Sequence, residues 1–302
     1  METLQVNRKQ IEKLSTVLNN SRIKIFEYLV DEDTLVVYNN KFHIEKTIAG
    51  YMDYIDNKSK IHPEDREKVK QIYKEAKEAT VEIREFGEDG DIKHSVLEFT
   101  KIVNEDGKLT LIGSTRNITE QRKQEKKLKE RARKDSLTGL YNQVYGKKCI
   151  NKYLNRKKPF DSCGMIVLDV DCFKLVNDNY GHEMGDHYLK AMADLLTGIA
   201  FGEQCMAVRL SGDEFVLFFY GYSDRKTIED KVRSGYEGRS SIQLPDGTSR
   251  RINASIGLAF AQRESERMED LINRADRAMY RVKRTEKNGI AIYDKTDEAG
   301  PV

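Results

Sequence analysis

Two patterns of apolar residues recur along this chain, and together they predict an α+β protein. Short apolar runs bounded by turn residues predict strands, and apolar residues three and four positions apart predict helices. In the first half, the predicted strands lie at residues 23–30, 35–38, 81–86, 92–103 and 109–115. A less regular segment runs to Lys60, and a helix begins at His62-Pro63-Glu64-Asp65. Proline in the first turn and acids at the positive end of the helix dipole favour this start.

Two more helices are predicted on either side of this first domain. A thin apolar stripe within residues 1–20 predicts an amphipathic helix that packs on the next domain or on a second copy of the chain. Residues 118–134 contain neither glycine nor proline and predict another helix. Its heptad seam is thin: Ile118, Gln121, Glu125, Leu128 and Ala132. This seam suits a marginal coiled coil whose register changes, or equally a solvated spacer helix.

The densest polar signal in the chain follows a buried strand in the second half. The apolar run Met165–Leu168 predicts that strand, and Asp169 and Asp171 come directly after it. Alternation places both carboxylates on one side of the strand end, where they repel each other unless a cation lies between them. Lys174, Asn177 and a Gly-His-x-x-Gly-Asp turn come next, and then a helix is predicted to begin. A surface turn of solvated acids is the alternative.

The rest of the second half supplies two more charged segments. Strands predicted at residues 206–210 and 215–220 enclose Ser211-Gly212-Asp213-Glu214, a tight hairpin with two acids at its tip. The most regular helix in the chain runs from Met268 to Val282, and Lys283 and Lys287 lie near its end. A break at Gly139, a helical face at residues 188–199 and strands at residues 252–260 and 290–293 complete this half.

These charged segments make chemical sense together around a divalent cation and a polyphosphate. Carboxylate oxygens without nearby His or Cys ligands favour magnesium, with manganese as a substitute. Two unit charges about 4 Å apart interact by roughly 4 kcal/mol at an effective dielectric of 20, so bare carboxylates repel a triphosphate until a metal reverses the sign. This pattern is typical of phosphoryl and nucleotidyl transfer. The chain has no Walker-type phosphate loop and no Gly-x-Ser-x-Gly elbow.

The composition of the chain limits which binding partners and which cellular compartment we expect. With 52 basic and 50 acidic residues the net charge is +2, which gives no reason to expect binding to nucleic acid or to a membrane surface. The apolar runs are too short to span a bilayer, and the N-terminus lacks the apolar core of a signal peptide. The four cysteines are widely spaced, which predicts free thiols in a reducing compartment. We therefore expect a cytoplasmic protein.

The first domain resembles a PAS sensor domain over about residues 20–118. The residues that carry this resemblance are the His62-Pro63-Glu64-Asp65-Arg66 helix start and the exit Gly113-Ser-Thr-Arg-Asn-Ile-Thr-Glu120. The resemblance implies a signal-sensing or dimerising role and leaves the sensed ligand open. No cysteine precedes Cys149, which argues against a flavin-adduct photoreceptor, and the lone histidines argue for haem only weakly.

The second domain resembles the GGDEF domain of diguanylate cyclases, with Ser211-Gly-Asp-Glu-Phe215 in place of the signature hairpin. Three further motifs occur in the family's order: residues 135–142, residues 169–186 and residues 275–283. The resemblance implies a fold similar to the nucleotidyl cyclase and polymerase palm, an antiparallel-rich sheet flanked by helices. The predicted division is an N-terminal helix (1–20), a PAS-like domain (21–118), a signalling helix (119–134), a GGDEF domain (135–296) and a tail (297–302).

The resemblance also implies roles for individual residues. Magnesium would be held by Asp169, the Val170 carbonyl and Asp213, and Glu214 would assist the metal or act as base on the attacking 3′-hydroxyl. Lys174, Lys283 and Lys287 would face the triphosphate, with Lys174 counted among the catalytic residues. Asn177 and Asp186 would read the guanine. The alternative for Asp186 is a helix N-cap, and the two roles are compatible if different oxygens serve each. The remaining substrate-binding positions would be Phe173, Ser211 and Gly212.

Catalysis in this family joins two GTP molecules into cyclic di-GMP plus pyrophosphate, so it implies a homodimer formed through the PAS-like domain and the linker helix. Four departures matter: Ser211 replaces a glycine, Gln143 and Lys287 each replace an arginine, and Gly202-Glu-Gln-Cys205 replaces the Arg-x-x-Asp motif of product inhibition. We therefore expect no high-affinity feedback at that site. Ser211 and Gln143 leave an alternative open, a degenerate GGDEF regulator that binds GTP without synthesis.

Overall fold

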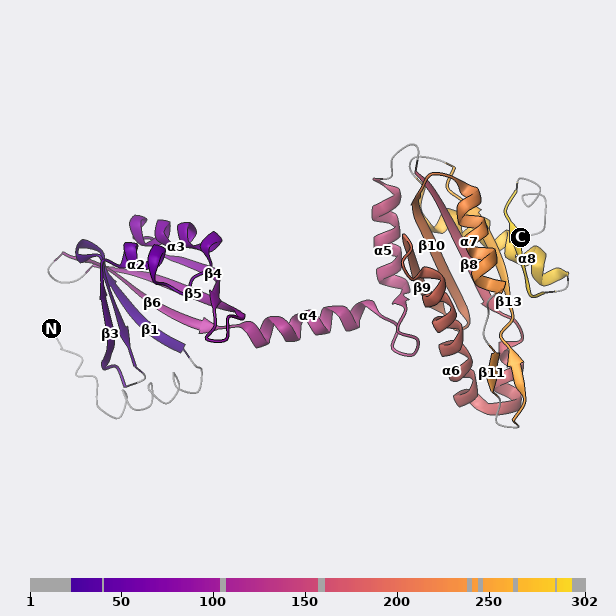
Figure 1. The fold of residues 1–302 in the computed structure, drawn as a ribbon, viewed down its shortest axis with the longest axis horizontal. Helices are drawn as coiled ribbons and strands as arrows, with labels where there is room; N and C mark the ends of the chain where they lie inside the picture. Colours follow the sequence, from indigo (N-terminus) through magenta and orange to yellow (C-terminus); the bar gives the residue numbers. More distant parts are fainter. Residues whose placement is uncertain are drawn as a thin grey trace, which may run out of the picture. The chain divides into compact units, whose positions relative to one another are not determined.

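The computed structural model of the chain describes most of the sequence in two compact units (Figure 1). The described residues are 23–39, 41–103, 107–156, 161–237, 241–243, 247–262, 266–285 and 287–294. The helix predicted within residues 1–20 and the tail predicted at residues 297–302 lie outside them. The units are Met1–Lys127 and Leu128–Val302, and each is described by itself.

A six-stranded antiparallel sheet forms one layer of the N-terminal unit. Its strand order is β3-β2-β1-β6-β5-β4. The strands are β1 (Ile23–Leu29), β2 (Thr34–Tyr38), β3 (Ile44–Ala49), β4 (Ala79–Phe86), β5 (Ile92–Val103) and β6 (Leu109–Asn117), with a 3-10 turn, η1 (Val30–Glu32), between β1 and β2. All five strands expected from the sequence are confirmed. Strand β3 was missed because it is a largely exposed edge strand and has no apolar run.

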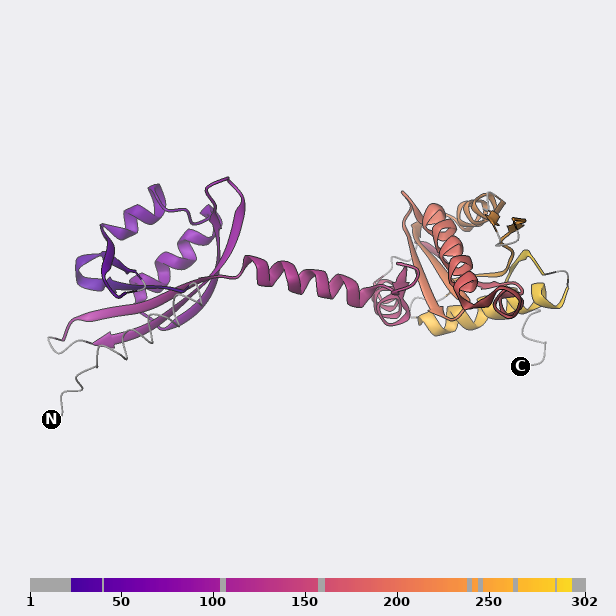
Figure 2. The ribbon, with the colours of Figure 1, turned by 90° about the horizontal axis from the view of Figure 1, so that it is seen from below.

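Two helices, α2 (Tyr51–Asn57) and α3 (Pro63–Glu75), cover one face of this sheet (Figure 2). Helix α3 begins at the predicted position, where the His62 side chain accepts a hydrogen bond from the Glu64 amide. Aromatic rings fill the space between the layers. Tyr73 lies at the centre, with its ring centroid 4.7 Å from that of Tyr28 and 5.1 Å from that of Phe99. Helix α2 lies in the segment that the sequence analysis left irregular.

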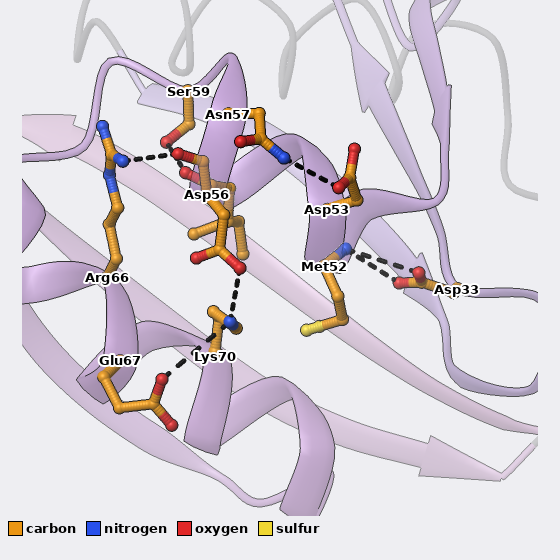
Figure 3. Close-up of polar contacts among 10 residues, drawn as sticks. Asp33, Met52, Asp53, Asp56, Asn57, Ser59, Arg66, Glu67 and Lys70 are labelled. Carbon is orange, nitrogen blue, oxygen red and sulfur yellow. Dashed lines mark hydrogen bonds and ion pairs between the residues drawn. The ribbon is translucent and has the colours of Figure 1, made fainter.

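Polar contacts fix the two helices to each other (Figure 3). The Lys70 ammonium on α3 pairs with the Asp56 carboxylate on α2 at 2.6 Å. Arg66 donates from Nε to the Ile61 carbonyl oxygen at 3.0 Å and from Nη1 to the Asp56 carbonyl oxygen at 2.5 Å. At the other end of α2, the Asp33 carboxylate accepts the Met52 amide at 3.2 Å. The bonds to the Asp56 carbonyl oxygen and the Met52 amide satisfy backbone groups that the ends of α2 leave without intrahelical partners.

Helix α4 (Thr119–Arg133) follows β6 and occupies the range where the sequence predicted a helix. None of its residues is buried, and Leu128, an apolar residue of the predicted seam, is 63% exposed. Ile118, which precedes the helix, is the buried member of that seam. In the described residues, no helix combines the length and apolar character needed to cross a membrane.

A mixed six-stranded sheet forms the centre of the C-terminal unit, in the order β14-β13-β8-β10-β9-β7. β7 pairs with β9 and β13 with β14 in parallel, and the other pairs are antiparallel. The strands are β7 (Tyr141–Asn142), β8 (Ser162–Val170), β9 (Cys205–Ser211), β10 (Glu214–Tyr222), β13 (Ala254–Phe260) and β14 (Gly289–Ile292). A small hairpin of β11 (Ser241–Gln243) and β12 (Ser249–Arg251) stands apart from this sheet.

Helices bury both faces of this sheet, which explains why β8 is a continuous apolar run. Ile166, Leu168 and Val170 pack with residues of α6 (Phe173–Ala200) and α7 (Arg225–Glu237). Met165 and Val167 point the other way and pack with α5 (Gln143–Leu154) and α8 (Met268–Arg284). The central strand is thereby fixed on both faces, and its end is a rigid platform for the acids that follow.

The segment after β8 differs from the sequence prediction in where its helix begins. Helix α6 starts at Phe173, one residue after Cys172, which adopts a left-handed backbone with φ of 62°. The predicted Gly-His-x-x-Gly-Asp turn is a kink within α6, because Gly181 alone is non-helical at φ 81° and ψ 166°. Asp186 lies inside the helix beyond this kink, so its interpretation as a helix N-cap is wrong. Helix α7 was not predicted.

Candidate active site

Two acidic segments meet at the end of β8. The strand pairing sets Asp169 on β8 directly opposite Glu214, the first residue of β10. At the hairpin tip, the Val170 amide donates to the Asp213 carbonyl oxygen at 3.3 Å. Partial burial and the neighbouring Asp169 carboxylate raise the pKa of Asp213. The sequence prediction that Asp169 and the hairpin acids lie together agrees with this geometry.

The oxygen atoms gathered here suit a hard cation. Asp169 and Asp213 carry carboxylates, and Val170, the residue after Asp169, bonds to the Asp213 carbonyl oxygen through its amide. Within the described part of the chain, no group of three or more His, Cys, Asp or Glu side chains has metal-binding geometry. Such a sparse set fits magnesium, which commonly takes one or two protein carboxylates and completes its shell with water and substrate phosphates. The crowding of two carboxylates supplies the charge that a cation would neutralise.

The lysines expected to face a triphosphate come from two elements. Lys283, on α8, places its Nζ atom 2.8 Å from Asp169 Oδ2, and the two side chains are 32% and 18% exposed. Lys287 follows α8 in a left-handed backbone and is exposed. Lys174 is exposed in the first turn of α6. Among the described residues, the structure therefore records an ion pair with these acids for Lys283 and none for Lys174 or Lys287.

The hairpin tip is held in place by an arginine that the sequence analysis did not assign. Arg209 on β9 donates from Nε and Nη2 to the Gly212 carbonyl oxygen, at 3.0 and 2.7 Å. Its Nη1 pairs with Asp135 Oδ1 at 2.9 Å. Asp135 Oδ1 also accepts from the amide and hydroxyl of Thr138. Because Gly212 has φ of 44°, the tip has a conformation that side chains disfavour, and this arginine stabilises it.

A pocket of about 370 Å³ adjoins the hairpin. It is lined by Asp135, Asn142, Gln143, Val144, Arg209, Leu210, Ser211 and Gly212. Gln143 and Ser211, two of the departures from the family pattern, therefore share one surface. The Ser211 hydroxyl also donates to Glu214 Oε2 at 3.0 Å. A glycine at position 211 would make no such contact, so this serine changes the environment of the candidate base.

The residues expected to read a base lie on both sides of the kink in α6. Asn177 Oδ1 is buried and has no hydrogen-bond partner. It lies against Gly185, where an added Cβ would come within 1.9 Å of that oxygen and 3.3 Å of the Phe173 ring. Asp186 follows Gly185 and is exposed. The kink thus brings Phe173, Asn177 and the Gly185–Asp186 segment together around a buried amide oxygen that has no hydrogen-bond partner.

Asp276, which lies within the motif at residues 275–283, is a further acid near this site and has no role predicted from the sequence. It lies on α8 seven residues before Lys283, a spacing that puts both on one face of the helix. Desolvation, and then the charge of Glu214, raise the pKa of Asp276, while Lys283 opposes the shift. The spacing of two helical turns between Asp276 and Lys283 was the signal in the sequence that could have identified Asp276.

The C-terminal unit matches a known family over most of its length. The family described as diguanylate cyclase, GGDEF domain, matches residues 132–289. The chain belongs to this diguanylate cyclase GGDEF family. The hairpin at Ser211–Phe215, the acids after β8 and the C-terminal lysines are all parts of this GGDEF domain.

The curated relatives of the chain include proteins that are named as diguanylate cyclases. The probable diguanylate cyclase DgcC of Escherichia coli K12 is 25% identical over 176 residues, covering 58% of this chain and 47% of the relative. Diguanylate cyclase VdcA of Vibrio cholerae is 29% identical over 249 residues, covering 80% of this chain and 68% of the relative. The chain thus spans about half the length of the first of these relatives.

A solved structure shares the fold of the GGDEF domain. The coiled coil and GGDEF domain of DgcB from Caulobacter crescentus, in complex with c-di-GMP, superposes with a TM-score of 0.52 at 23% identity. The match covers 58% of this chain and 93% of that structure. At this identity the likeness shows the fold of the C-terminal unit.

Proposed function

We propose that this protein is a magnesium-dependent diguanylate cyclase, which condenses two GTP molecules into cyclic di-GMP and releases pyrophosphate. The observation that carries the proposal is the convergence of Asp169, the Asp213–Glu214 hairpin and Lys283 at one strand end. In each of two equivalent steps, a 3′-hydroxyl oxygen bonds to the α-phosphorus of the other GTP. The bond from that phosphorus to the β-phosphate oxygen breaks, and pyrophosphate leaves.

Each residue of the site would have a separate role in this reaction. Asp169, the Val170 carbonyl and Asp213 would hold magnesium, which would supply charge neutralisation and polarise the α-phosphate. Lys283, now paired with Asp169, would exchange that carboxylate for a phosphate oxygen once the cation takes its place. Glu214 is the candidate base for the 3′-hydroxyl proton. Because most of the rate enhancement in such transfers comes from positioning and electrostatics, the rigid end of β8 suits the task.

Base selection would belong to Asn177 and Asp186. The Asp186 carboxylate would accept hydrogen bonds from N1 and N2 of guanine, for which adenine offers no matching donors. We expect Asp186→Ala to reduce the preference for GTP over ATP about 10- to 100-fold, the range for a lost charge-assisted pair. Competition binding of the two nucleotides in magnesium measures the ratio. Asp194→Ala, which removes an exposed acid from the same helix, should keep it, and an unchanged ratio in Asp186→Ala would contradict the assignment.

The two remaining parts of the chain would regulate this reaction. The N-terminal unit has an antiparallel sheet with helices on one face, consistent with a PAS-like sensor, and α4 carries apolar seam residues such as Leu128 that no described residue covers. Each GGDEF domain holds one GTP, so the reaction needs two copies face to face. We propose a homodimer through the sensor and α4, in which the sensor's state sets the geometry of the two sites. Light scattering with and without GTP tests the dimer.

A second function is favoured by one observation, the bond from the Ser211 hydroxyl to Glu214. In that case the domain would bind GTP without joining it and would act as a regulator. Incubation of the pure protein with GTP and magnesium, followed by chromatography of the nucleotides, separates the two. Formation of cyclic di-GMP supports the cyclase, whereas GTP binding without product supports the regulator.

Ser211→Gly tests how far this contact limits turnover. We expect a rise of about 3- to 10-fold, because one hydrogen bond to a charged group is removed from the candidate base and the backbone opens to phosphate. Initial rates of pyrophosphate release provide the measurement. Ser211→Ala is the matched control, since it removes the hydroxyl and keeps Cβ. Equal rates in all three proteins would show that position 211 does not limit the reaction.

A further inference from the structure

Asp171, the second acid after β8, has contacts that separate it from the acidic site. Its Oδ1 accepts the Ser255 hydroxyl at 2.8 Å, and its Oδ2 accepts the Asn288 amide at 2.9 Å. Ser255 is fully buried on β13, where it pairs with Asp169 on one side and with Gly289 of β14 on the other. The Asp171 carboxylate therefore joins the end of β8 to the segment that follows α8.

That segment has an unusual backbone. Lys287 and Asn288 are consecutive residues with φ of 54° and 49°, and neither is glycine. Side chains disfavour this left-handed region, and such residues persist where the surroundings over-determine them. The Lys287 amide donates to the Val282 carbonyl oxygen at 3.2 Å, which makes a tight reversal at the end of α8. The strain identifies a segment that the rest of the fold holds in position.

Asn288 is held from two directions. Its amide donates to Asp171, and its side-chain Oδ1 lies 2.9 Å from the Tyr236 hydroxyl on α7. Tyr236 is itself buried and accepts the Ala254 amide at 2.7 Å. Helix α7 and the segment after β8 thus converge on the residue next to Lys287, and the Lys287 side chain itself is exposed.

We propose that Asp171 is a positioning residue that holds the Lys287–Asn288 segment so that the Lys287 ammonium faces the triphosphate. The proposal rests on the proposed function, because it takes the nucleotide as the occupant of the site. The two acids after β8 then have different roles: Asp169 belongs to the cation and Lys283, and Asp171 belongs to the loop. Both Asp171 oxygens already accept hydrogen bonds, one from the Asn288 amide of the loop and one from the Ser255 hydroxyl of β13.

A double-mutant cycle tests this coupling through nucleotide affinity. The probe is a GTP analogue with a methylene group between the α- and β-phosphorus atoms, bound to the full chain in magnesium and measured by calorimetry. We expect Asp171→Asn to weaken binding about 10-fold, since the amide cannot replace both acceptors, and Lys287→Ala to weaken it to a similar extent. In the Lys287→Ala background, Asp171→Asn should weaken binding of the analogue by less than about 2-fold further. The effects of two residues that act through one another are non-additive.

Other outcomes would overturn the proposal. An Asp171→Asn loss that persists in full in the Lys287→Ala background would make Asp171 an independent ligand of the cation or nucleotide. If Asp171→Asn binds the GTP analogue with unchanged affinity, Asp171 does not position Lys287. Ser255→Ala is the matched control, because it deletes the other contact of the same carboxylate and leaves the Asn288 amide bonded; its affinity should stay within about 2-fold of the parent protein.

Hydrogen exchange provides a readout that does not depend on turnover or on nucleotide. We expect the Asn288 amide to be protected in the parent protein and the peptide containing it to exchange faster in Asp171→Asn. If the parent protein binds no GTP, the proposed function fails while this measurement still tests the contact. If Asp171→Asn does not fold, hydrogen exchange of the Asn288 amide in the parent protein tests the contact by itself. An unprotected Asn288 amide would then overturn the proposal.

Discussion

Asp213→Ala should abolish formation of cyclic di-GMP, with a loss of about 1,000-fold or more, and should leave the fold intact. The carboxylate lies at a hairpin tip beside Asp169, where its charge opposes folding of the metal-free protein and serves a cation and triphosphate when these are bound. Removal of a group that stabilises the transition state costs about 100- to 1,000-fold by itself, and loss of the metal adds to that. Product formation in saturating magnesium and thermal unfolding without magnesium measure the two effects separately.

Glu203→Ala is the matched control for Asp213→Ala, and we expect it to have the opposite effects on turnover and on unfolding temperature. Glu203 precedes the same hairpin, pairs with Lys231 at 2.5 Å and accepts the Tyr222 hydroxyl at 2.5 Å. Glu203→Ala should therefore lower the unfolding temperature and keep turnover, whereas Asp213→Ala should lose turnover and keep or raise the unfolding temperature. An Asp213→Ala protein that still forms cyclic di-GMP at more than about one tenth of the parent rate would refute the assigned role.

The local sequence predicted the parts of the site that depend on short-range pattern. The run Met165–Leu168 marked β8 because both faces of that strand are buried, and residues 211–215 marked the hairpin because glycine and acids lie between two apolar runs. The regular apolar face of α8 likewise fixed the position of Lys283. In these cases a few neighbouring residues determine the structure, so the sequence is sufficient.

The failures have a common physical cause, which is contact between residues distant in sequence. Alternation was extended from Asp169 to Asp171, but the chain leaves β8 at Val170, and Asp171 instead meets Ser255 and Asn288. The start of α6 at Phe173 depends on a left-handed Cys172, which no propensity indicates. Arg209 was overlooked because its partner, Asp135, lies 74 residues away. No local pattern carries such information.

A substitution at the closest approach between the sheet and α8 should have the largest effect on stability. Gly257 on β13 faces the backbone of this helix, and an added Cβ would lie 1.8 Å from the Ala275 carbonyl oxygen and 2.6 Å from the Met279 nitrogen. Backbone atoms cannot rotate away as side chains do, so the whole helix must move. We expect Gly257→Ala to destabilise the C-terminal unit by about 3 kcal/mol or more, the upper range for overpacking, which corresponds to a fall of about 6–12 °C in unfolding temperature.

The same substitution should impair the site, because α8 carries Lys283 and Asp276 and is displaced as a body. Gly198→Ala is the matched control: it lies in α6 with nothing within 4 Å of an added Cβ, so it should be neutral or stabilise by about 0.5–1 kcal/mol. Calorimetry of the three proteins, with hydrogen exchange of α8, makes the comparison. If Gly257→Ala unfolds at the parent temperature, α8 does not pack on β13 as closely as described, and the distance between Lys283 and Asp169 loses its structural basis.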